Sequence, residues 1–408
     1  MTSGFQKQKL ARERDAAAGL VTRVLRLRLK DRHAPALRAK ACEVNTVWNF
    51  VNESCQRAFE RERRFLSAAD LHELTVGAGK AGMSLHSQTI QAVNEEFVLR
   101  RKQFKKIKLR WRISNPNRSD RSLGWIPFKK SAIRYKAGQV HLAGEPLSLW
   151  DSYGLADHEL GSGSICEDAR GRWYLNVCVK VKRAEKAESS TKLEAIGIDL
   201  GLKEFMVDSE GSKVEAQRFY RDLEPALAVA QRAGKKDRTR ALHAKIANRR
   251  KDFLHKLSTA QANAHCAIFV GNVNASRLAK TPMAKSVLDA GWSMYRTMLM
   301  NKCDHAGSWF SEIDESFSTQ ECSNCAARTG PKGLAGLSTR QWQCTQCNSV
   351  HDRDTNSALV IKKRGLEWLA KQFEQFSNAD SRLEESAAAV NKAGSGTAAT
   401  PRPGMAVQ

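Results

Sequence analysis

The spacing of apolar and polar residues changes along the chain and predicts alternating blocks of strands and helices. Near the N-terminus, 24–30 alternates apolar with basic side chains, which is typical of a strand with one buried face. Residues 35–66, 68–75 and 87–106 carry apolar side chains at helical spacing, and a polar break at 111–121 follows. The period then returns toward two, with short strands predicted at 124–128, 132–135, 139–142, 163–167 and 173–181. We expect a small β-barrel, completed by the first strand, with the helices inserted into it.

The second half of the chain opens with an apolar strand, 195–202, that is interrupted by Asp199. A second strand, a turn at 208–211 and a third strand follow, which is how an RNase H-like sheet begins. Further along, the pattern predicts a long basic helical region at 221–261, a buried strand at 266–270, a helix at 286–304, a strand at 309–313 and a helix at 355–376. The expected fold class is therefore a multi-domain α/β protein.

Composition adds a partner to this picture. The chain has 408 residues, enough for two or three domains, and its 67 Lys and Arg against 43 Asp and Glu give a net charge of +24. Such an excess favours a polyanion, above all nucleic acid, over an anionic membrane surface, because no run of about 18 apolar residues exists. The first 20 residues lack the apolar core of a secretory signal, so the cytoplasm is the expected compartment.

Four of the ten cysteines have the spacing of a metal site. They form two pairs, each with two intervening residues: Cys322 with Cys325, and Cys344 with Cys347. This arrangement predicts a zinc ribbon, in which four thiolates leave no open position on the metal, so that the zinc is structural. The other six cysteines stand singly in apolar or helical contexts and are expected to be reduced, buried thiols.

Two acidic positions point to chemistry. A carboxylate inside an apolar strand, as at Asp199, is costly unless it meets a cation, although a turn cap or a salt bridge explains a single acid equally well. Asp354 follows the last cysteine by seven residues, just before a predicted helix, where an N-cap is the alternative and Asp352 competes for the same role. Several carboxylates converging on two Mg²⁺ ions are what metal-dependent hydrolysis of a phosphodiester requires.

At this point the order of parts resembles the TnpB family of transposon proteins, which are relatives of the compact type V CRISPR effectors. The resemblance covers nearly the whole chain. The residues that carry it are Gly197-Ile198-Asp199-Leu200-Gly201, the run from His243 to Ser258, Ser318-Thr319-Gln320 before Cys322, the four cysteines, and Asp352-Arg353-Asp354-Thr355-Asn356-Ser357-Ala358.

The resemblance implies an RNA-guided DNA endonuclease of the bacterial cytoplasm with a RuvC-like active site. Asp199 then matches the first catalytic aspartate and Asp354 the last, with two Mg²⁺ ions as cofactors beside the structural zinc. The implied partners are a guide RNA and double-stranded target DNA with a short flanking motif, read by base pairing and by the protein respectively. No membrane partner is expected, and both a monomer and a homodimer remain open.

The chain departs from the family at the second catalytic carboxylate. Where most members have Glu-Asp-Leu after the strand at 268–270, this chain has Gly271-Asn272-Val273. We expect Glu315, after the next strand, to replace the missing glutamate, in preference to its acidic neighbours Asp314 and Glu312. The alternatives are a nuclease-inactive, RNA-guided DNA-binding protein and an unguided transposase accessory protein.

Basic residues of the long helical region are expected to hold guide RNA or heteroduplex, although a solvated face explains such a charge run as well. These residues are Lys235, Lys236, Lys245, Arg249, Arg250, Lys251 and Lys256. Trp48 and Asn49 resemble a family position near the duplex of the flanking motif, while core packing explains Trp48 equally well.

The predicted domain boundaries use the family's names for the parts. They are a disordered N-terminus at 1–18, a WED-like β-barrel at 19–33 and 112–185, an inserted helical recognition domain at 34–111, a RuvC-like nuclease domain at 193–317 and 348–380 with the zinc ribbon at 318–347 inserted, and a disordered tail at 384–408.

Overall fold

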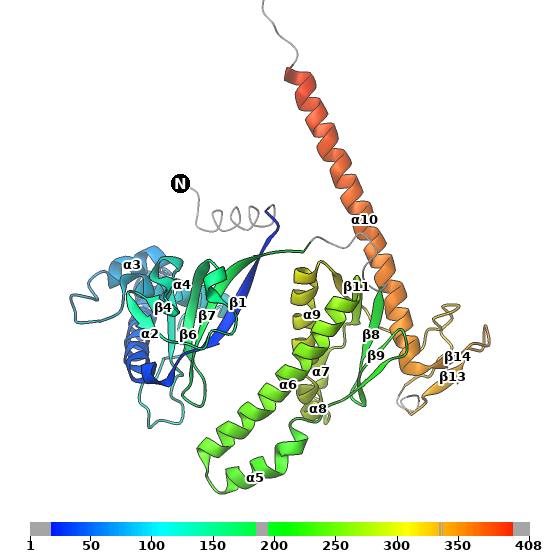
Figure 1. The fold of residues 1–408 in the computed structure, drawn as a ribbon, viewed down its shortest axis with the longest axis horizontal. Coiled ribbons are helices and arrows are strands. Elements are labelled where there is room, and N and C mark those ends of the chain that lie inside the picture. Colours follow the sequence, from blue (N-terminus) through cyan, green and yellow to red (C-terminus); the bar gives the residue numbers. More distant parts are fainter. Residues whose placement is uncertain (1–17, 185–194, 334–335, 337, 395–408) are drawn as a thin grey trace, which may run out of the picture. The chain divides into compact units, whose positions relative to one another are not determined.

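The computed structural model describes residues 18–184, 195–333, 336 and 338–394 (Figure 1). The chain forms two compact units, Met1–Arg183 with Pro225–Lys245, and Ala184–Glu224 with Ile246–Gln408. Each unit is α/β, which confirms the predicted fold class at this level. Among the described residues, no helix combines the length and the apolar character needed to cross a membrane.

The first unit contains a four-stranded antiparallel sheet in the order β1-β7-β6-β2. Its strands are β1 (Leu20–Arg28), β7 (Trp173–Lys182), β6 (Leu160–Glu167) and β2 (Trp125–Phe128). The alternation near the N-terminus is confirmed, because Leu25, Leu27 and Leu29 are buried and β1 pairs with β7 along its whole length.

A second sheet of this unit has the order β3-β4-β5. It consists of β3 (Ile133–Lys136), β4 (Gln139–Leu142) and β5 (Glu145–Leu147), the last of which the sequence pattern did not predict. A closed barrel built from the two sheets stays a prediction. Four short 3-10 helices also occur in the chain, η1 (Asp31–His33), η2 (Lys130–Ala132), η3 (Leu155–Asp157) and η4 (Arg221–Leu223).

Three helices lie between β1 and β2, as the spacing predicts. They are α2 (Ala34–Glu62), α3 (Ala68–Thr75) and α4 (Ser87–Phe104). α2 ends at Arg63, which adopts the left-handed conformation, and α3 starts with a capping box between Ser67 and Asp70. Their apolar faces share one core with the strands of this unit.

Two asparagines of α2 form hydrogen bonds with the main chain of the extended segment that follows α4. The Asn52 side chain donates to the Leu109 carbonyl (2.7 Å) and accepts from the Leu109 N–H (3.0 Å). Asn49 repeats the pattern with the carbonyl and N–H of Arg112, both at 2.8 Å. We call these contacts the asparagine clamp. It satisfies main-chain groups that a neighbouring strand would otherwise satisfy.

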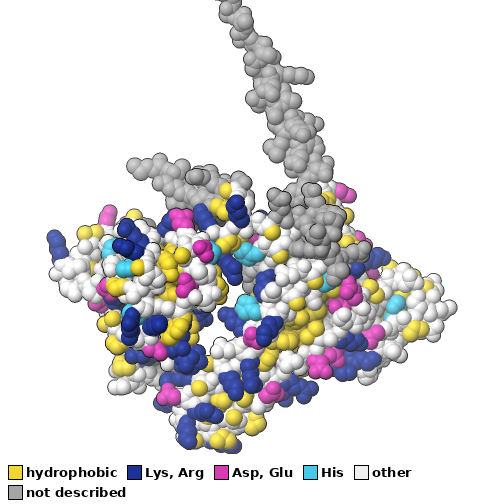
Figure 2. Space-filling model, in the orientation of Figure 1, with side chains coloured by type: hydrophobic (Ala, Val, Ile, Leu, Met, Phe, Trp, Pro, Cys, Tyr) yellow, Lys and Arg dark blue, Asp and Glu magenta, His cyan; other side chains and the backbone are white. Residues whose placement is uncertain are grey.

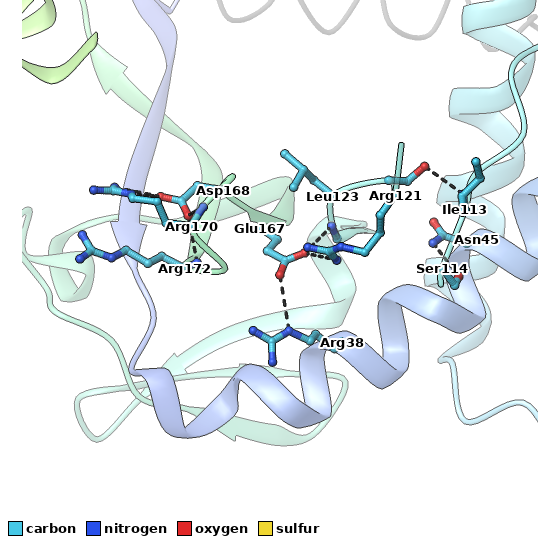
Figure 3. A network of polar contacts seen from close by, with 12 residues as sticks. Arg38, Asn45, Ile113, Ser114, Arg121, Leu123, Glu167, Asp168, Arg170 and Arg172 are labelled. Atoms are coloured by element: carbon cyan, nitrogen blue, oxygen red, sulfur yellow. Dashed lines mark hydrogen bonds and ion pairs between the residues drawn. The ribbon is translucent and has the colours of Figure 1, made fainter. Parts of the chain in front are cut away.

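A buried acid of this unit is fully paired (Figure 3). Glu167, at the end of β6, has a side chain only 1% exposed. One oxygen accepts from Arg121 (2.9 Å) and from the Gly124 N–H (3.0 Å), and the other lies 3.5 Å from Arg38 of α2. These donors outweigh desolvation, so the pKa of Glu167 lies below its ordinary value.

The second unit contains a five-stranded sheet in the order β10-β9-β8-β11-β12. The strands are β8 (Ile196–Leu200), β9 (Glu204–Asp208), β10 (Lys213–Glu215), β11 (Ala267–Gly271) and β12 (Trp309–Ile313). The adjacent strands β8, β11 and β12 are parallel, whereas β9 and β10 are antiparallel to their neighbours. The carboxyl ends of the three parallel strands therefore meet at one edge of the sheet.

The long helix α10 (Arg353–Gly394) packs against this sheet at close range. A side-chain carbon at Gly197 of β8 would collide with the Ala358 carbonyl, and one at Gly365 of α10 would collide with the Phe269 ring. The helix continues to Gly394. The predicted boundary of a disordered tail at 384–408 stays a prediction. Residues 395–408, and 1–17 of the predicted disordered N-terminus, lie outside the described residues.

The remaining helices of the chain are α5 (Glu224–Arg232), α6 (Lys236–Ala264), α7 (Ala275–Leu278), α8 (Ala284–Ala290) and α9 (Trp292–Ala306). The single helix predicted at 286–304 is wrong at one point. Gly291 adopts φ +72°, a left-handed conformation that ends α8 and lets α9 start in a new direction. Between β12 and α10, β13 (Gln341–Gln343) and β14 (Val350–Asp352) form an antiparallel hairpin.

Candidate functional site

Asp199 lies on β8, the central strand of the five-stranded sheet, one residue before the strand ends. Its carboxylate accepts a hydrogen bond from the buried Ser357 hydroxyl of α10, and Ser357 in turn contacts the Ser318 hydroxyl (2.7 Å). Burial, together with the negative charges of Glu315 and Asp354, raises the pKa of Asp199 to about 8. The acid predicted from its place in an apolar strand therefore lies within electrostatic reach of two other acids, and the positive charge of Arg353 partly offsets them.

Glu315 reaches the same place from the turn after β12. β11 and β12 run in parallel with Gly271 opposite Ile313, so Glu315 lies just beyond the end of its strand. Its side chain passes directly over Gly271, since a side-chain carbon at that glycine would lie 2.5 Å from the Glu315 Oε2 atom. A side chain at 271 would therefore displace the Glu315 carboxylate from its observed position.

Desolvation raises the pKa of Glu315, while the positive charge of Arg296 on α9 and the Val273 N–H oppose the rise. Arg296 also pairs with Glu312 of β12 (3.1 Å). Glu312 and Asp314 are both exposed. Of the three acids around this turn, Glu315 is the one whose charge acts on Asp199.

Asp354 begins α10 and is held by two arginines. Arg340 of the ribbon donates to its Oδ2 atom (2.8 Å), and Arg353 donates to Oδ1 (3.0 Å). Asp352 has a different task, because its Oδ1 atom caps the helix at the Thr355 N–H (3.0 Å) and its Oδ2 atom pairs with Lys213 (2.9 Å). The structure thus brings Asp354, and not Asp352, within electrostatic reach of Asp199.

The four predicted cysteines lie together, with all their sulfur atoms within 4.8 Å of one another. Among the described residues, these four cysteines are the group of His, Cys, Asp or Glu side chains whose ligand atoms come this close together. The carboxylate oxygen atoms of Asp199, Glu315 and Asp354 do not all lie within 4.8 Å of one another. Cys322 also contacts the Nε2 atom of His351 (3.1 Å), and Cys344 accepts from the Thr329 hydroxyl (3.2 Å). Such a cluster is compatible with a structural zinc ion.

The basic residues predicted to contact nucleic acid fall into two groups. Most of them are exposed on the α5–α6 segment, where Lys and Arg side chains gather in Figure 2; these are Lys235, Lys236, Lys245, Arg249, Lys251 and Lys256. Arg250 is different, because it is half-buried and donates to the carbonyl (2.7 Å) and the carboxylate (2.6 Å) of Asp289. Its charge is therefore used inside the second unit.

Trp48 and Asn49 also face inward. Trp48 is 8% exposed, packs edge-to-face on Phe97 and Trp125, and donates to the Arg110 carbonyl (3.3 Å). Both polar groups of Asn49 are engaged in the asparagine clamp. The core interpretation of Trp48 is confirmed, and the contacts of Asn49 argue against a free side chain for nucleic acid.

Several residues around the carboxylates were not singled out from the sequence. Ser357 and Ser318 lie in motifs that were quoted for other reasons, and their buried hydroxyls emerge only from the packing of α10. Arg296 and Arg364 sit in ordinary helical patterns, and no local signal distinguishes them from other arginines.

Comparison with known proteins places these features in a family. Residues 176–281 match the family described as "Probable transposase", and 292–361 match "Cas12f1-like, TNB domain". A 140-residue stretch, 33% of this chain, is 26% identical to part of "TnpB-like protein L79" of Acanthamoeba polyphaga mimivirus, covering 26% of that protein. These similarities relate parts of the chain to transposase and TnpB-like proteins.

Two bacterial relatives cover more of the chain. A protein of Streptomyces pristinaespiralis named "Putative RNA-guided DNA endonuclease" is 32% identical over 59% of this chain and 62% of its own length. "Putative RNA-guided DNA endonuclease InsQ" of Escherichia coli K12 is 24% identical over 49% of this chain and 56% of its own length. The chain thus spans less than two thirds of the length of these relatives.

The fold is shared with a solved structure of low sequence similarity. The protein chain in the "Cryo-EM structure of the Cas12f1-sgRNA-target DNA complex" is 11% identical, with a TM-score of 0.55 over 84% of this chain and 99% of that chain. At such identity the similarity concerns the fold alone.

Proposed function

We propose that this protein is an RNA-guided DNA endonuclease that cleaves target DNA by Mg²⁺-dependent hydrolysis in a RuvC-like site. The strand order of the second unit, in which two antiparallel strands flank three parallel ones, is that expected of an RNase H-like sheet. The printed names of the two bacterial relatives support the activity. The observation that carries the proposal is the Glu315 side chain lying over Gly271.

That observation answers the question raised by the missing glutamate. A carboxylate lost from the end of β11 would leave a gap beside Asp199, and here the neighbouring strand supplies one over the same glycine. The glycine at 271 leaves the space that the Glu315 carboxylate occupies. Loss of one glutamate and gain of the other are therefore two parts of one arrangement, which supports an intact catalytic centre.

The donor set suits divalent cations of the Mg²⁺ type. Mg²⁺ prefers oxygen ligands and binds through a few carboxylates, and Asp199, Glu315 and Asp354 offer these at one edge of a sheet. The raised pKa values of Asp199 and Glu315 show that their negative charges are under-compensated by the protein. Two bound ions would activate the attacking water and stabilise the leaving oxygen.

The residues around the carboxylates have assigned tasks in this proposal. Ser357 orients Asp199 through its hydroxyl, and Arg296 offsets the charge of Glu315. Asp354 is oriented by Arg340 and Arg353 and has to give up part of this pairing in order to act as a ligand. Asp352 fixes the start of α10 and is not a ligand.

The basic surface of α6 and the four cysteines of the ribbon support two further parts of the proposal, the nucleic-acid partners and a structural zinc ion. The exposed basic residues of α6 are proposed to bind the phosphates of guide RNA or of the heteroduplex, without reading sequence. Target DNA is chosen by base pairing with the guide, beside a short flanking motif. The four cysteines are proposed to bind a structural zinc that fixes the hairpin leading directly into Asp354.

The test uses the protein purified with RNA expressed from its flanking sequence. A plasmid library carrying a guide-matched target next to randomised flanks is incubated with this complex and Mg²⁺, and linear product is sequenced. Glu315→Ala should reduce cleavage by about a hundredfold or more while leaving guided DNA binding intact, since one preorganised charged group is removed. Glu367→Ala, which removes an exposed acid of α10, is the control and should cleave like the wild type.

Three results would overturn the proposal. Guided binding without cleavage by the wild type, in Mg²⁺ and in Mn²⁺, would make the chain a nuclease-inactive DNA-binding protein. Binding of DNA that does not depend on RNA would instead support an unguided transposase accessory protein. Equal cleavage by Glu315→Ala and wild type would remove Glu315 from the site.

A further inference from the structure

An arginine of α10 forms hydrogen bonds with the turn that carries Glu315. The Nη1 atom of Arg364 donates to the carbonyl of Asp314 (2.7 Å) and to the carbonyl of Ser316 (3.0 Å). These two carbonyls flank Glu315 along the chain. One guanidinium therefore fixes the main chain on both sides of the residue whose side chain reaches Asp199.

The opposite side of the turn is held by Asn272, the residue after Gly271. Its side-chain oxygen accepts from the Glu315 N–H (3.3 Å), and its main-chain N–H donates to the Ile313 carbonyl (2.9 Å). The Asn272 amide also donates to the Asp314 carboxylate. The turn is thus tied to the ends of both β11 and β12.

We infer that Arg364 and Asn272 are positioning residues that hold the Glu315 carboxylate beside Asp199; this rests on the function proposed above. A glutamate at 271 would start from a strand with hydrogen-bonded neighbours on both sides, β8 and β12. Glu315 starts from a turn beyond its strand, where the main chain has more freedom. Moving a ligand from a strand to a turn therefore requires a new support, and these contacts supply it.

A purely structural role for Arg364 is the competing interpretation. Its Nη2 atom pairs with Glu321 (2.7 Å), one residue before the first cysteine, so it also anchors the ribbon. The two tasks use different atoms and can be separated. Glu321→Gln weakens the ribbon contact and leaves both carbonyl contacts in place.

The primary measurement is calorimetric titration of the RNA-bound protein with Mn²⁺ in the absence of DNA, accompanied by the Mn²⁺-induced rise in melting temperature. Arg364→Gln should weaken Mn²⁺ binding about tenfold or more, as is typical when a residue that orients a metal ligand is lost. Lys363→Gln, which removes the adjacent exposed charge, and Glu321→Gln should both bind like the wild type. Arg364→Lys should recover part of the affinity, because an ammonium can still donate to a carbonyl.

A transplanted carboxylate gives the sharpest test. In Gly271→Glu/Glu315→Ala the ligand comes from the strand end, and removal of the Glu315 carboxylate frees the space that a side chain at 271 needs. The Ile361 methyl group, 3.2 Å from the added carbon, then has to move only slightly. In this background Arg364→Gln should have little further effect on Mn²⁺ binding.

If the double variant fails to fold, amide hydrogen exchange of residues 314–317 in the single variants still tests the inference. Exchange there should be faster in Arg364→Gln and in Asn272→Ala, and unchanged in Lys363→Gln. The inference is overturned if Arg364→Gln binds Mn²⁺ like the wild type, if exchange is unaltered, or if the loss is equally large in the transplanted background. Absence of Mn²⁺ binding in the wild type would instead refute the proposed nuclease site.

Discussion

Two buried acids of this protein, Glu167 in the first unit and Asp199 in the second, have opposite surroundings. Glu167 meets Arg121, Arg38 and a main-chain N–H, and its pKa is lowered (Figure 3). Asp199 meets two other carboxylates, with Ser357 as its hydrogen-bond donor, and its pKa is raised to about 8. The charge of the first acid is compensated within the fold, whereas the second has the surroundings expected of the proposed cation ligand.

The largest expected difference concerns divalent cations. Asp199→Asn should weaken Mn²⁺ binding by about a hundredfold or more, because it removes a charged ligand from the centre of the site. Glu167→Gln should leave Mn²⁺ affinity unchanged. Calorimetric titration of both variants with Mn²⁺ measures these affinities. Equal Mn²⁺ affinity of Asp199→Asn and the wild type would show that Asp199 is not a metal ligand.

Thermodynamic stability should be lowered more by the substitution at Glu167 than by the substitution at Asp199. Glu167→Gln removes one partner of a buried ion pair and should lower the free energy of unfolding of the first unit by about 3 kcal/mol. Asp199→Asn, measured in EDTA, should unfold at the same or a higher denaturant concentration than the wild type, since it relieves repulsion between carboxylates. A destabilised Asp199→Asn would show that this acid serves the fold after all.

The pH dependence of stability should differ in sign. Because the folded-state pKa of Asp199 is raised from 3.8 to about 8, the unfolded chain binds fewer protons between these values. In EDTA, the free energy of unfolding should therefore fall with rising pH, relative to Asp199→Asn, with a slope approaching about 1.4 kcal/mol per pH unit. The pKa of Glu167 is lowered, so its contribution is present above pH 4.5 and is lost as the pH falls further. Unfolding curves of wild type and both variants from pH 3 to 8 compare the two.

The smallest expected effect concerns two adjacent arginines, Arg249 and Arg250. One of them is paired within the fold and the other is exposed. Arg250 is paired with Asp289, so Arg250→Gln should cost about 1 to 2 kcal/mol of stability. Arg249 is exposed, and Arg249→Gln should change stability by less than about 0.5 kcal/mol. The second variant should instead weaken RNA binding and reduce its salt dependence by about one phosphate contact. Unfolding and salt-dependent binding curves would contradict this if the two variants behaved alike.

Local patterns were sufficient for those parts of the protein that depend on local spacing. Alternation identified β1, the isolated acid in an apolar strand identified Asp199, and the cysteine pairs predicted a cluster that the structure brings together. The placement of Glu315 could be expected from the missing glutamate, but the reason for it, the open space above Gly271, exists only once two strands pair in register.

Other side chains have intramolecular partners that the sequence could not predict, because a tertiary contact decides where they lie. Arg250 looked like its exposed neighbours in the sequence, yet its partner Asp289 lies 39 residues further along the chain. Asn49 resembled a nucleic-acid contact, yet its partner is a main-chain segment 63 residues away. Asp352 and Asp354 stand two residues apart, and only the folded start of α10 distinguishes the helix cap from the acid whose charge acts on Asp199.

The asparagine clamp has a practical consequence for engineering. It binds the segment after α4 through main-chain atoms at Leu109 and Arg112, so the attachment does not depend on the side chains at 110 and 111. Both of these side chains, Arg110 and Trp111, are exposed. Substitution libraries at 110 and 111 can therefore vary the chemistry displayed at this position while the anchoring of the segment is retained.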